Sequence, residues 1–295
     1  MSAINVLNIH QFGQEKHSSD LYSNSFSEHL KRNENLIRTP HKHDFYLCVV
    51  FTKGTGIHEI DFNSYKIEAG SVFFLKPGQT HFWKFTSSPE GYIFFHSQEF
   101  YNLSFSTKDL TQFPFFYSYK STPSLHLKTS ELKKIVPKFK NINNEFHESL
   151  PYKNQKIASL INTTYIDLAR HYSIEASNLG LISPHYLSIF RALENNIELY
   201  FHTEYTASFY AEKLNISAKH LNRITRETVN KTTTELITDR VILEAKRLIV
   251  HSNNQLSKIA ELVGYEDYAY FSKVFKSKTK RTPSEFRNDY RNLNS

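Results

Sequence analysis

The chain has 295 residues, 39% hydrophobic and 15% aromatic, so it is long enough for two domains with buried cores and too hydrophobic to be disordered. Its net charge of +7 favours an anionic partner, and its single cysteine, Cys48, excludes an intrachain disulfide or a thiolate zinc site. The N-terminus lacks a signal-peptide pattern and no run approaches about 20 apolar residues, so we expect a cytoplasmic protein without membrane contact.

The first third of the chain has the pattern of a β-rich domain. Residues 1–36 are mixed and polar, which predicts an arm with one or two strands. From His41 to about Phe100, short β-rich runs are interrupted by Gly, Pro and Asn about every ten residues. This spacing predicts strands over 45–51, 57–62, 71–75, 82–85 and 92–96. We therefore expect an all-β sandwich or barrel over residues 1–124.

Two histidine motifs lie within this predicted domain. His41-Lys42-His43 and Pro77-Gly78-Gln79-Thr80-His81 resemble the two halves of a cupin barrel motif. Metal-binding cupins carry a Glu ligand shortly after the His-x-His, and this chain has Phe-Tyr-Leu over residues 45–47 instead. We therefore predict no bound metal or other cofactor. Zinc or iron would fit only if His41, His43 and His81 converge, because imidazole suits both metals.

The aromatic residues of these strands have two interpretations. Some must fill the core of the domain, and the others can line a pocket, since an eight-stranded barrel has room for one small ligand. These residues are Phe45, Tyr46, Phe73, Phe74, Phe82, Trp83 and Phe85. The candidate polar anchors of such a ligand pocket are His43, Lys76 and His81.

Two amphipathic helices are predicted between residues 125 and 182. The first stripe contains Leu132, Ile135, Val136, Phe139 and Phe146, and the second contains Ile157, Leu160, Ile161, Tyr165, Leu168 and Ala169. Such a pair can pack on its own barrel or against a second copy of the chain, and the pattern does not decide between them. We expect these helices to connect the domains or support dimerisation, with a linker over residues 173–184.

Residues 183–295 contain one helical unit twice. Apolar residues recur at i, i+3, i+4 and i+7, first from Ala207 to Leu214 and again from Leu256 to Val263. Asn215 and Gly264 follow as turn residues that tolerate left-handed backbone. The next buried faces are Leu221 and Ile224 in the first unit, and Phe271, Val274 and Phe275 in the second. Each spacing predicts a helix-turn-helix.

Capping signals and flanking helices complete this pattern. Thr232 with Glu235, and Thr282 with Glu285, form a capping box after each unit. A helix over residues 185–201 leads into the first unit, and a long helix over residues 232–250 joins the two units as a rigid spacer. The sequence thus predicts seven helices after residue 183.

Particular residues of both units carry a family resemblance. They are Ile259-Ala260, Val263-Gly264-Tyr265, Tyr270-Phe271-Ser272, Val274-Phe275-Lys276 and 282–287, with Ala211, Leu214, Ser217, Leu221 and Arg223 in the first unit. Residues 183–295 resemble the DNA-binding domain of the AraC/XylS family of bacterial transcription regulators, and the histidine motifs resemble its N-terminal sensor barrel. The chain departs from the family pattern at Thr225, Asn230 and Lys280. We expect backbone strain at Lys280, which stands where the family usually has Gly, and a smaller hydrophobic core around Thr225, which replaces a usual Phe.

Helical geometry and the resemblance together select the residues that face DNA. The resemblance implies base-edge contacts at Lys219, Asn222, Arg223, Tyr268, Ala269, Ser272 and Lys273. Their chemistry suits guanine, adenine and thymine edges. The predicted phosphate contacts are Arg226, Lys276, Lys278 and Arg281. Because a rigid helix joins the units, the two reading helices should enter the major groove about 34 Å apart.

The sequence therefore predicts an α+β two-domain protein, with a cupin-like sensor barrel over 1–124, connecting helices over 125–182 and an all-α DNA-binding domain over 183–295. We expect a sequence-specific, ligand-responsive transcription activator rather than an enzyme, with no catalytic residues. Its expected partners are double-stranded promoter DNA and a small-molecule effector, and RNA polymerase and a second copy of the chain are further candidates. The alternatives are a metal-dependent cupin enzyme with an appended helical domain, and a regulator whose barrel only dimerises.

Overall fold

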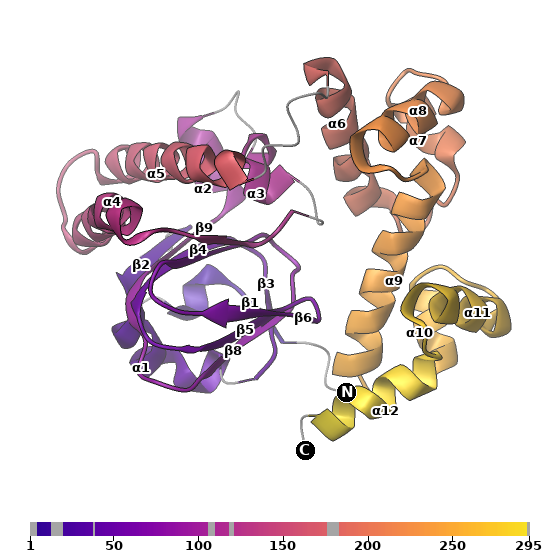
Figure 1. Cartoon of the computed structure of the whole chain (residues 1–295), viewed down its shortest axis with the longest axis horizontal. Helices are drawn as coiled ribbons and strands as arrows, with labels where there is room; N and C mark the ends of the chain where they lie inside the picture. The colour runs from indigo at the N-terminus through magenta and orange to yellow at the C-terminus, as the bar shows by residue number, and fades with distance from the viewer. Residues whose placement is uncertain are drawn as a thin grey trace. The chain divides into compact units, whose positions relative to one another are not determined.

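The computed structural model describes residues 5–12, 20–37, 39–105, 110–117, 121–175 and 183–293 (Figure 1). The chain divides into two compact units, Asn5–Ser177 and Asn178–Ser295. The first unit is rich in β-strands and the second is helical, so the predicted α+β class is confirmed. Most of the linker predicted over residues 173–184 lies outside the described residues. Among the described helices, none has the length and apolar character of a membrane span.

The strands of the first unit form two main sheets. Their bounds are β1 Val6–Leu7, β2 Leu21–Ser25, β3 Lys42–His43, β4 Tyr46–Lys53, β5 Gly56–Ile60, β6 Asn63–Ile67, β7 Ser71–Leu75, β8 His81–Phe85, β9 Glu90–His96 and β10 Ser124–His126. One antiparallel sheet has the order β10-β7-β4-β9-β2, and the other has the order β6-β5-β8. The short strands β1 and β3 pair in parallel.

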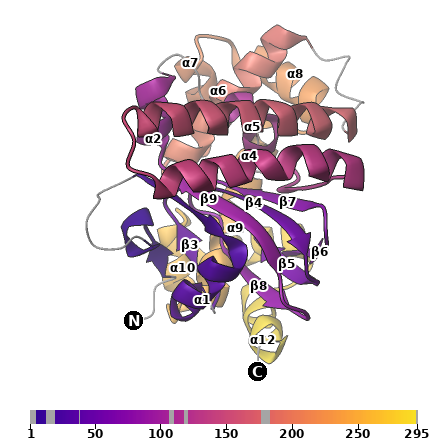
Figure 2. The ribbon, with the colours of Figure 1, turned by 90° about the vertical axis from the view of Figure 1, so that its left-hand side faces the viewer.

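Helices cover the outer face of the five-stranded sheet. The helices of this unit are α1 Phe26–Ile37, α2 Gln98–Ser104, α3 Pro114–Tyr117, α4 Thr129–His147 and α5 Lys153–Glu175, with 3₁₀ turns η1 Ile9–Phe12 and η2 Leu110–Gln112. Figure 2 shows α4 and α5 side by side across β9, β4 and β7. The predicted helix pair therefore packs on its own sheet.

The side chains of β4 point alternately to the two faces of the five-stranded sheet and so contribute to two separate hydrophobic cores. Leu47 and Val49 point between the two sheets, where they join Phe45, Phe73, Trp83 and Phe95. Cys48 and Val50 point the other way and pack with residues of α4 and α5, including Phe139 and Tyr165. Both faces of the central strands are thus covered, which explains why β7 is buried at all five positions.

Two parts of this unit differ from the sequence prediction. Residues 1–36 were predicted as an arm with one or two strands, but Phe26–Ile37 form the helix α1, which is bent at Asn33. The strand predicted over 57–62 ends at Ile60, because Asp61 and Phe62 form a two-residue hairpin turn with φ of 47° and 72°. Positive φ at both central residues is typical of a type I′ turn, which pairs β5 with β6.

The second unit consists, in its described residues, of seven helices as predicted. They are α6 Pro184–Tyr200, α7 Ala207–Lys213, α8 Ala218–Val229, α9 Thr233–His251, α10 Leu256–Leu262, α11 Tyr268–Thr279 and α12 Pro283–Leu293. The Thr232 side chain accepts from the backbone N–H of Glu235, and the Glu235 carboxylate accepts from the backbone N–H of Thr232, at the start of α9. Thr282 and Glu285 form the same capping box before α12. Both predicted capping boxes are confirmed.

The two helix-turn-helix units share the same backbone turn. After α7, the N–H groups of Asn215 and Ile216 donate to carbonyls of the last helical turn, and Gly264 and Tyr265 repeat this pattern after α10. This is the Schellman arrangement. Asn215 and Gly264 both have positive φ, at 53° and 88°, as the sequence predicted. The second turn has one residue more, because five residues separate α10 from α11 and four separate α7 from α8.

Candidate nucleic-acid interface and barrel interior

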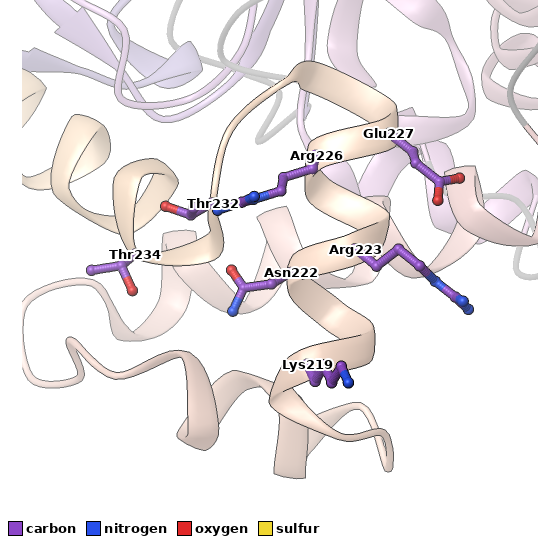
Figure 3. A pocket seen from close by; sticks show the side chains of 7 residues that line it. All are labelled: Lys219, Asn222, Arg223, Arg226, Glu227, Thr232 and Thr234. Carbon is purple, nitrogen blue, oxygen red and sulfur yellow. The ribbon is translucent and has the colours of Figure 1, made fainter.

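The exposed side of α8 forms one wall of a hollow of about 650 Å³. It is lined by Lys219, Asn222, Arg223, Arg226, Glu227, Thr232 and Thr234. Figure 3 shows Asn222 and Arg226 directed toward the start of α9, with Arg223 and Glu227 on the other flank of α8. The structure thus brings together the four first-unit residues predicted to contact DNA. The opposite face of α8 is fixed by Leu221 and Ile224, which are fully buried.

Arg223 is held in place by two aromatic neighbours. Its guanidinium nitrogen lies 2.9 Å from Nδ1 of His220, one turn earlier on α8. The Tyr186 ring of α6 lies below the guanidinium, with its centroid 5.9 Å from Cζ. These two neighbours orient the planar guanidinium of Arg223. Because the side chain is exposed, the guanidinium can still donate a pair of hydrogen bonds outward.

Asn222 has a structural partner in addition to its predicted contact. Its side-chain oxygen accepts a 2.9 Å hydrogen bond from the backbone N–H of Thr233, the first residue of α9. An adenine edge needs both the oxygen and the nitrogen of an Asn amide for a bidentate pair. The amide nitrogen remains for DNA, so we expect Asn222 to donate to a base acceptor rather than to form the full pair.

The second reading helix presents a comparable outer face. Tyr268, Ala269 and Lys273 are exposed and Ser272 is partly exposed, whereas Phe271 and Phe275 are fully buried. Val274, predicted to point inward, is only partly buried. In α8 the position that corresponds to Phe275 holds Thr225, which is buried and donates to the carbonyl of Asn222.

The predicted phosphate contacts fall into two groups. Arg226 and Lys276 are exposed on the second half of each reading helix. Lys278 lies 2.9 Å from the carboxylate of Asp239 on α9, and Arg281 forms an ion pair with Asp289 on α12. DNA phosphates would have to compete with these carboxylates for Lys278 and Arg281. Lys280, which ends α11, adopts left-handed backbone with a φ of 65°.

Histidines gather inside the first unit, between the two sheets. His41 and His81 form an isolated antiparallel bridge with their backbones, and their ring centroids lie 4.4 Å apart. The ring of His43 lies 5.1 Å from that of His81. His58 of β5 joins them, with Nε2 2.9 Å from Nδ1 of His81. All four side chains are buried.

The tautomers of two of these histidines follow from their backbone partners. Nδ1 of His41 lies 2.8 Å from the Thr39 carbonyl, and Nδ1 of His43 lies 2.7 Å from the Phe45 carbonyl. A carbonyl only accepts, so each Nδ1 carries the proton and each Nε2 is left as an acceptor. Burial, with a smaller contribution from the neighbouring His41, lowers the pKa of His43 to about 3, against the opposing effect of the hydrogen bond to Phe45. The His43 ring is therefore neutral near pH 7.

Several buried polar atoms in this interior lack a hydrogen-bond partner within the described part of the chain. They are Nε2 of His29, His43 and His81, Nδ1 of His58, Oγ1 of Thr80 and Nε1 of Trp83. Buried polar groups without a partner are costly, so this concentration of them makes the interior a candidate binding site for a polar molecule. Lys76, the third predicted anchor, lies in the turn after β7, where its backbone N–H donates to Gln79 and its side chain is partly exposed.

The arrangement of these histidines bears on the question of a metal site. Among the described residues, no three His, Cys, Asp or Glu side chains are arranged so that they could hold a metal ion. The geometry therefore does not favour the metal-dependent enzyme that the His-x-His motif left open.

Some residues of both sites were missed by the sequence argument. His58 shares the inward face of β5 with Ile60, so strand alternation could have identified it. His29 lies on the helix α1, in a segment predicted as an arm with one or two strands. Glu227, Thr232 and Thr234 line the hollow beside α8, but only the fold brings α9 next to α8.

Comparisons with known proteins identify the two units. A model of helix-turn-helix domains matches residues 210–289, and a model of AraC-like ligand-binding domains matches residues 26–114. The chain belongs to the AraC family of transcription regulators. In this AraC-family chain the helix-turn-helix match spans both reading helices, and the ligand-binding match includes all of the buried histidines just described.

Relatives of this AraC-family protein are named as transcriptional activators. It is 23% identical over 251 residues to the HTH-type transcriptional activator RhaR of Cronobacter sakazakii, which covers 85% of this chain and 87% of that protein. It is 26% identical over 256 residues to the HTH-type transcriptional activator Btr of Bacillus subtilis, covering 84% of this chain and 45% of that protein. Among solved structures, an apo ToxT variant of Vibrio cholerae is 16% identical, with a TM-score of 0.42 over 92% of this chain and 98% of that one.

Proposed function

We propose that this regulator reads double-stranded promoter DNA with α8 and α11, and that a small polar molecule bound between the two sheets controls this binding. The observation that carries the proposal is the pair of exposed reading faces. Lys219, Arg223 and Arg226 on α8 are repeated by Ala269, Lys273 and Lys276 on α11, each set opposite a buried apolar face. Arg and Lys donors on such a face suit guanine edges and phosphates.

The spacer helix supports reading by both helices of one chain. α9 has 19 residues, which gives a length of about 28 Å. Arg240 anchors it, because its Nε lies 2.9 Å from a carboxylate oxygen of Glu198 on α6 and its guanidinium lies 4.0 Å from the Phe201 ring centroid. We expect α8 and α11 to enter successive major-groove segments about 34 Å apart, on an asymmetric site that bends if the helices require it.

The effector proposal rests on the buried imidazoles. His43 Nε2 is an acceptor without a partner, and the free nitrogens of His58 and His81 supply one donor and one acceptor whichever way their shared proton lies. A ligand with hydroxyl or N–H groups would satisfy this set. Such a ligand can switch the protein only through different affinities for its DNA-binding and non-binding states.

The direction of regulation and the remaining partners belong to the same proposal. Because RhaR and Btr are named as activators, we propose that this chain also activates transcription. RNA polymerase and a second copy of the chain are the further partners proposed. We assign residues 1–124 to sensing, 125–182 to connection and dimerisation, and 183–295 to DNA binding.

Selection from a random DNA library tests the DNA-binding proposal. The full chain is expected to enrich duplexes with two short conserved segments about one helical turn apart. Affinity for the selected duplex should fall steeply with salt, since phosphate contacts release counterions. If the library yields no enriched sequence and the chain binds no duplex at low salt, the proposed function is wrong.

A ligand screen separates sensing from a barrel that only dimerises. A metabolite library is tested for thermal stabilisation, and hits are measured by calorimetry on the wild-type chain and on His43→Phe. A ligand that binds the wild type but not the variant supports the sensing role. If no compound binds and the mass of the chain in solution is that of a dimer, the barrel serves dimerisation.

A further inference from the structure

The two helix-turn-helix units touch each other directly, away from the spacer helix. Tyr205 lies between α6 and α7, at the start of the first unit. Its hydroxyl donates a 2.5 Å hydrogen bond to the carbonyl of His202 and lies 3.5 Å from the carbonyl of Val263, at the end of α10. Gly264, the turn residue of the second unit, lies against the same hydroxyl.

This contact leaves no room for a side chain at position 264. A Cβ added to Gly264 would lie 1.3 Å from the Tyr205 hydroxyl oxygen and 2.4 Å from the ring carbon that bears it. It would also lie 2.8 Å from the carbonyl oxygen of His202. Atoms without a bond between them do not approach this closely, so any larger residue must displace the Tyr205 ring and shift the His202 carbonyl.

The first unit shows that the turn itself does not require glycine. Asn215 and Gly264 end their helices with the same Schellman hydrogen bonds and the same sign of φ. Asn is accepted at this position of the motif. The close approach of Tyr205 is therefore the feature that distinguishes position 264 from position 215.

The loop that carries Tyr205 is fixed to the first unit. The Tyr210 hydroxyl, which extends from the core of α7, donates a 2.9 Å hydrogen bond to the carbonyl of Glu204. Phe201, at the other end of the loop, stacks against Arg240 of α9. Because α11 begins only four residues after Gly264, a displacement of this turn moves Tyr268 and Ala269.

We propose that Tyr205 and Gly264 are positioning residues that set the separation and angle of the two reading helices on DNA. This inference rests on the proposed function, since it assumes that α8 and α11 bind one DNA site together. α9 joins the two units, and the direct contact between Tyr205 and Gly264 adds a second link that restricts rotation of one unit against the other. The pair thereby determines which spacing between the two DNA segments the chain prefers.

A spacing series tests the proposal. The duplex selected with the wild-type chain is resynthesised with its two segments moved closer or further by one to three base pairs, and the affinity for each duplex is measured. The wild type should show one sharp optimum. In the wild type, the affinity for the duplex of optimal spacing exceeds the affinity for the neighbouring spacings by some ratio, and Tyr205→Ala should reduce this ratio at least threefold. The affinity of the variant for a duplex that keeps only one segment should change little.

Gly264→Asn gives the complementary test, because it places the residue of the first turn into the second. We expect at least a tenfold loss of affinity at the wild-type spacing, and recovery toward the Tyr205→Ala value in the double variant Tyr205→Ala/Gly264→Asn. Asn215→Gly, at the exposed counterpart, is the control and should keep the wild-type profile. Circular dichroism and thermal unfolding establish that each variant is folded.

The outcomes separate this inference from the proposed function. A wild-type chain that binds no duplex overturns the proposed function and the inference with it. A wild-type chain that binds, together with an unchanged spacing profile in Tyr205→Ala, overturns the inference alone. If Gly264→Asn does not fold, the profile of Tyr205→Ala decides, since that variant only removes the contact.

Discussion

The side-chain oxygen of Asn222 accepts a hydrogen bond from the backbone N–H of Thr233, at 2.9 Å, and so ties the first reading helix to the spacer helix. Thr233 is fully buried, and its N–H belongs to the first turn of α9, where helix donors have no partner within the helix. The residue predicted to read a base thus also helps to cap the next helix.

Asn222→Ala should lower both stability and DNA affinity. The buried Thr233 N–H loses its acceptor, which costs about 1 kcal/mol, and the amide that faces DNA is lost as well. Asn222→Asp keeps an acceptor for Thr233, so its unfolding free energy should stay near the wild-type value while DNA affinity falls. Denaturant unfolding and duplex binding distinguish the two effects. Equal destabilisation by Ala and Asp would show that the hydrogen bond contributes nothing.

Lys273→Ala and Lys276→Ala should affect DNA binding in different ways. Both lysines are exposed on α11, three residues apart, so each variant is a matched control for the other. Loss of Lys273 should relax base preference at one position, at a cost of about 1–3 kcal/mol on the preferred sequence. Loss of Lys276 should weaken binding to all DNA sequences equally. It should also reduce the slope of log affinity against log salt concentration by about one. Identical behaviour in competition and salt titrations would contradict our division into base and phosphate contacts.

Asp239→Asn should destabilise the second unit. The Asp239 carboxylate accepts hydrogen bonds from Lys231 and Lys278, which approach from beside α8 and from α11. Burial tends to raise the pKa of Asp239, but the two lysines outweigh it and hold that pKa below its ordinary value. The stabilisation is present above the unfolded pKa of about 3.9 and is lost as the pH falls through the lowered pKa.

At pH 7 we expect Asp239→Asn to lower the free energy of unfolding by about 1 kcal/mol, less at high salt. Glu261→Gln removes one partner of the exposed pair with Lys258 and serves as the control. It should change the unfolding free energy by less than about 0.5 kcal/mol. Helix content in denaturant series gives both values. A loss in Glu261→Gln as large as that in Asp239→Asn would refute a special role for the half-buried carboxylate of Asp239.

Acid should destabilise the barrel through its buried histidines. The folded pKa of His43 is lowered to about 3 by burial, whereas an unfolded histidine has a pKa of about 6.5. The unfolded chain therefore binds more protons below pH 6.5, and stability falls as the pH drops toward 3. His43→Gln should reduce the slope of the unfolding free energy against pH by up to about 1.4 kcal/mol per pH unit.

Trp83 fluorescence measures that unfolding, because Trp83 is the only tryptophan of the sequence and lies between the sheets. His10→Gln, at an exposed position of η1, is the matched control for the replacement of a histidine by glutamine. An unchanged slope in His43→Gln would mean that the ring takes up a proton in the folded state at mildly acidic pH.

The reading units were predictable because their signals are local. Helix periods, turn residues and capping boxes such as Thr232 with Glu235 all fall within a few residues of each other, and each was found where it was predicted. The pairing of Lys278 with Asp239 was not predictable, since 39 residues separate them and only the packing of α11 on α9 brings them together. The division between base and phosphate contacts stays a prediction.

The barrel was predictable in its strands and less so in its interior. The α1 helix escaped detection because His29 and Asn33 occupy two of its buried positions, which weakens the apolar stripe that marks an amphipathic helix. The histidine cluster depends on the pairing of β5 with β8, which sets His58 opposite Trp83 and beside His81. Sequence spacing alone linked only His41, His43 and His81.

The seam between the five-stranded sheet and its helical cover contains the only thiol of the sequence. Cys48 is fully buried there, and burial raises the pKa of its thiol well above the ordinary value. A thiol reagent can therefore reach Cys48 only when the packing around it opens. The rate of Cys48 labelling thus reports how often that opening occurs, without an engineered probe. A change in this rate on addition of effector or DNA would tell whether either one stabilises the packing between the sheet and its helices.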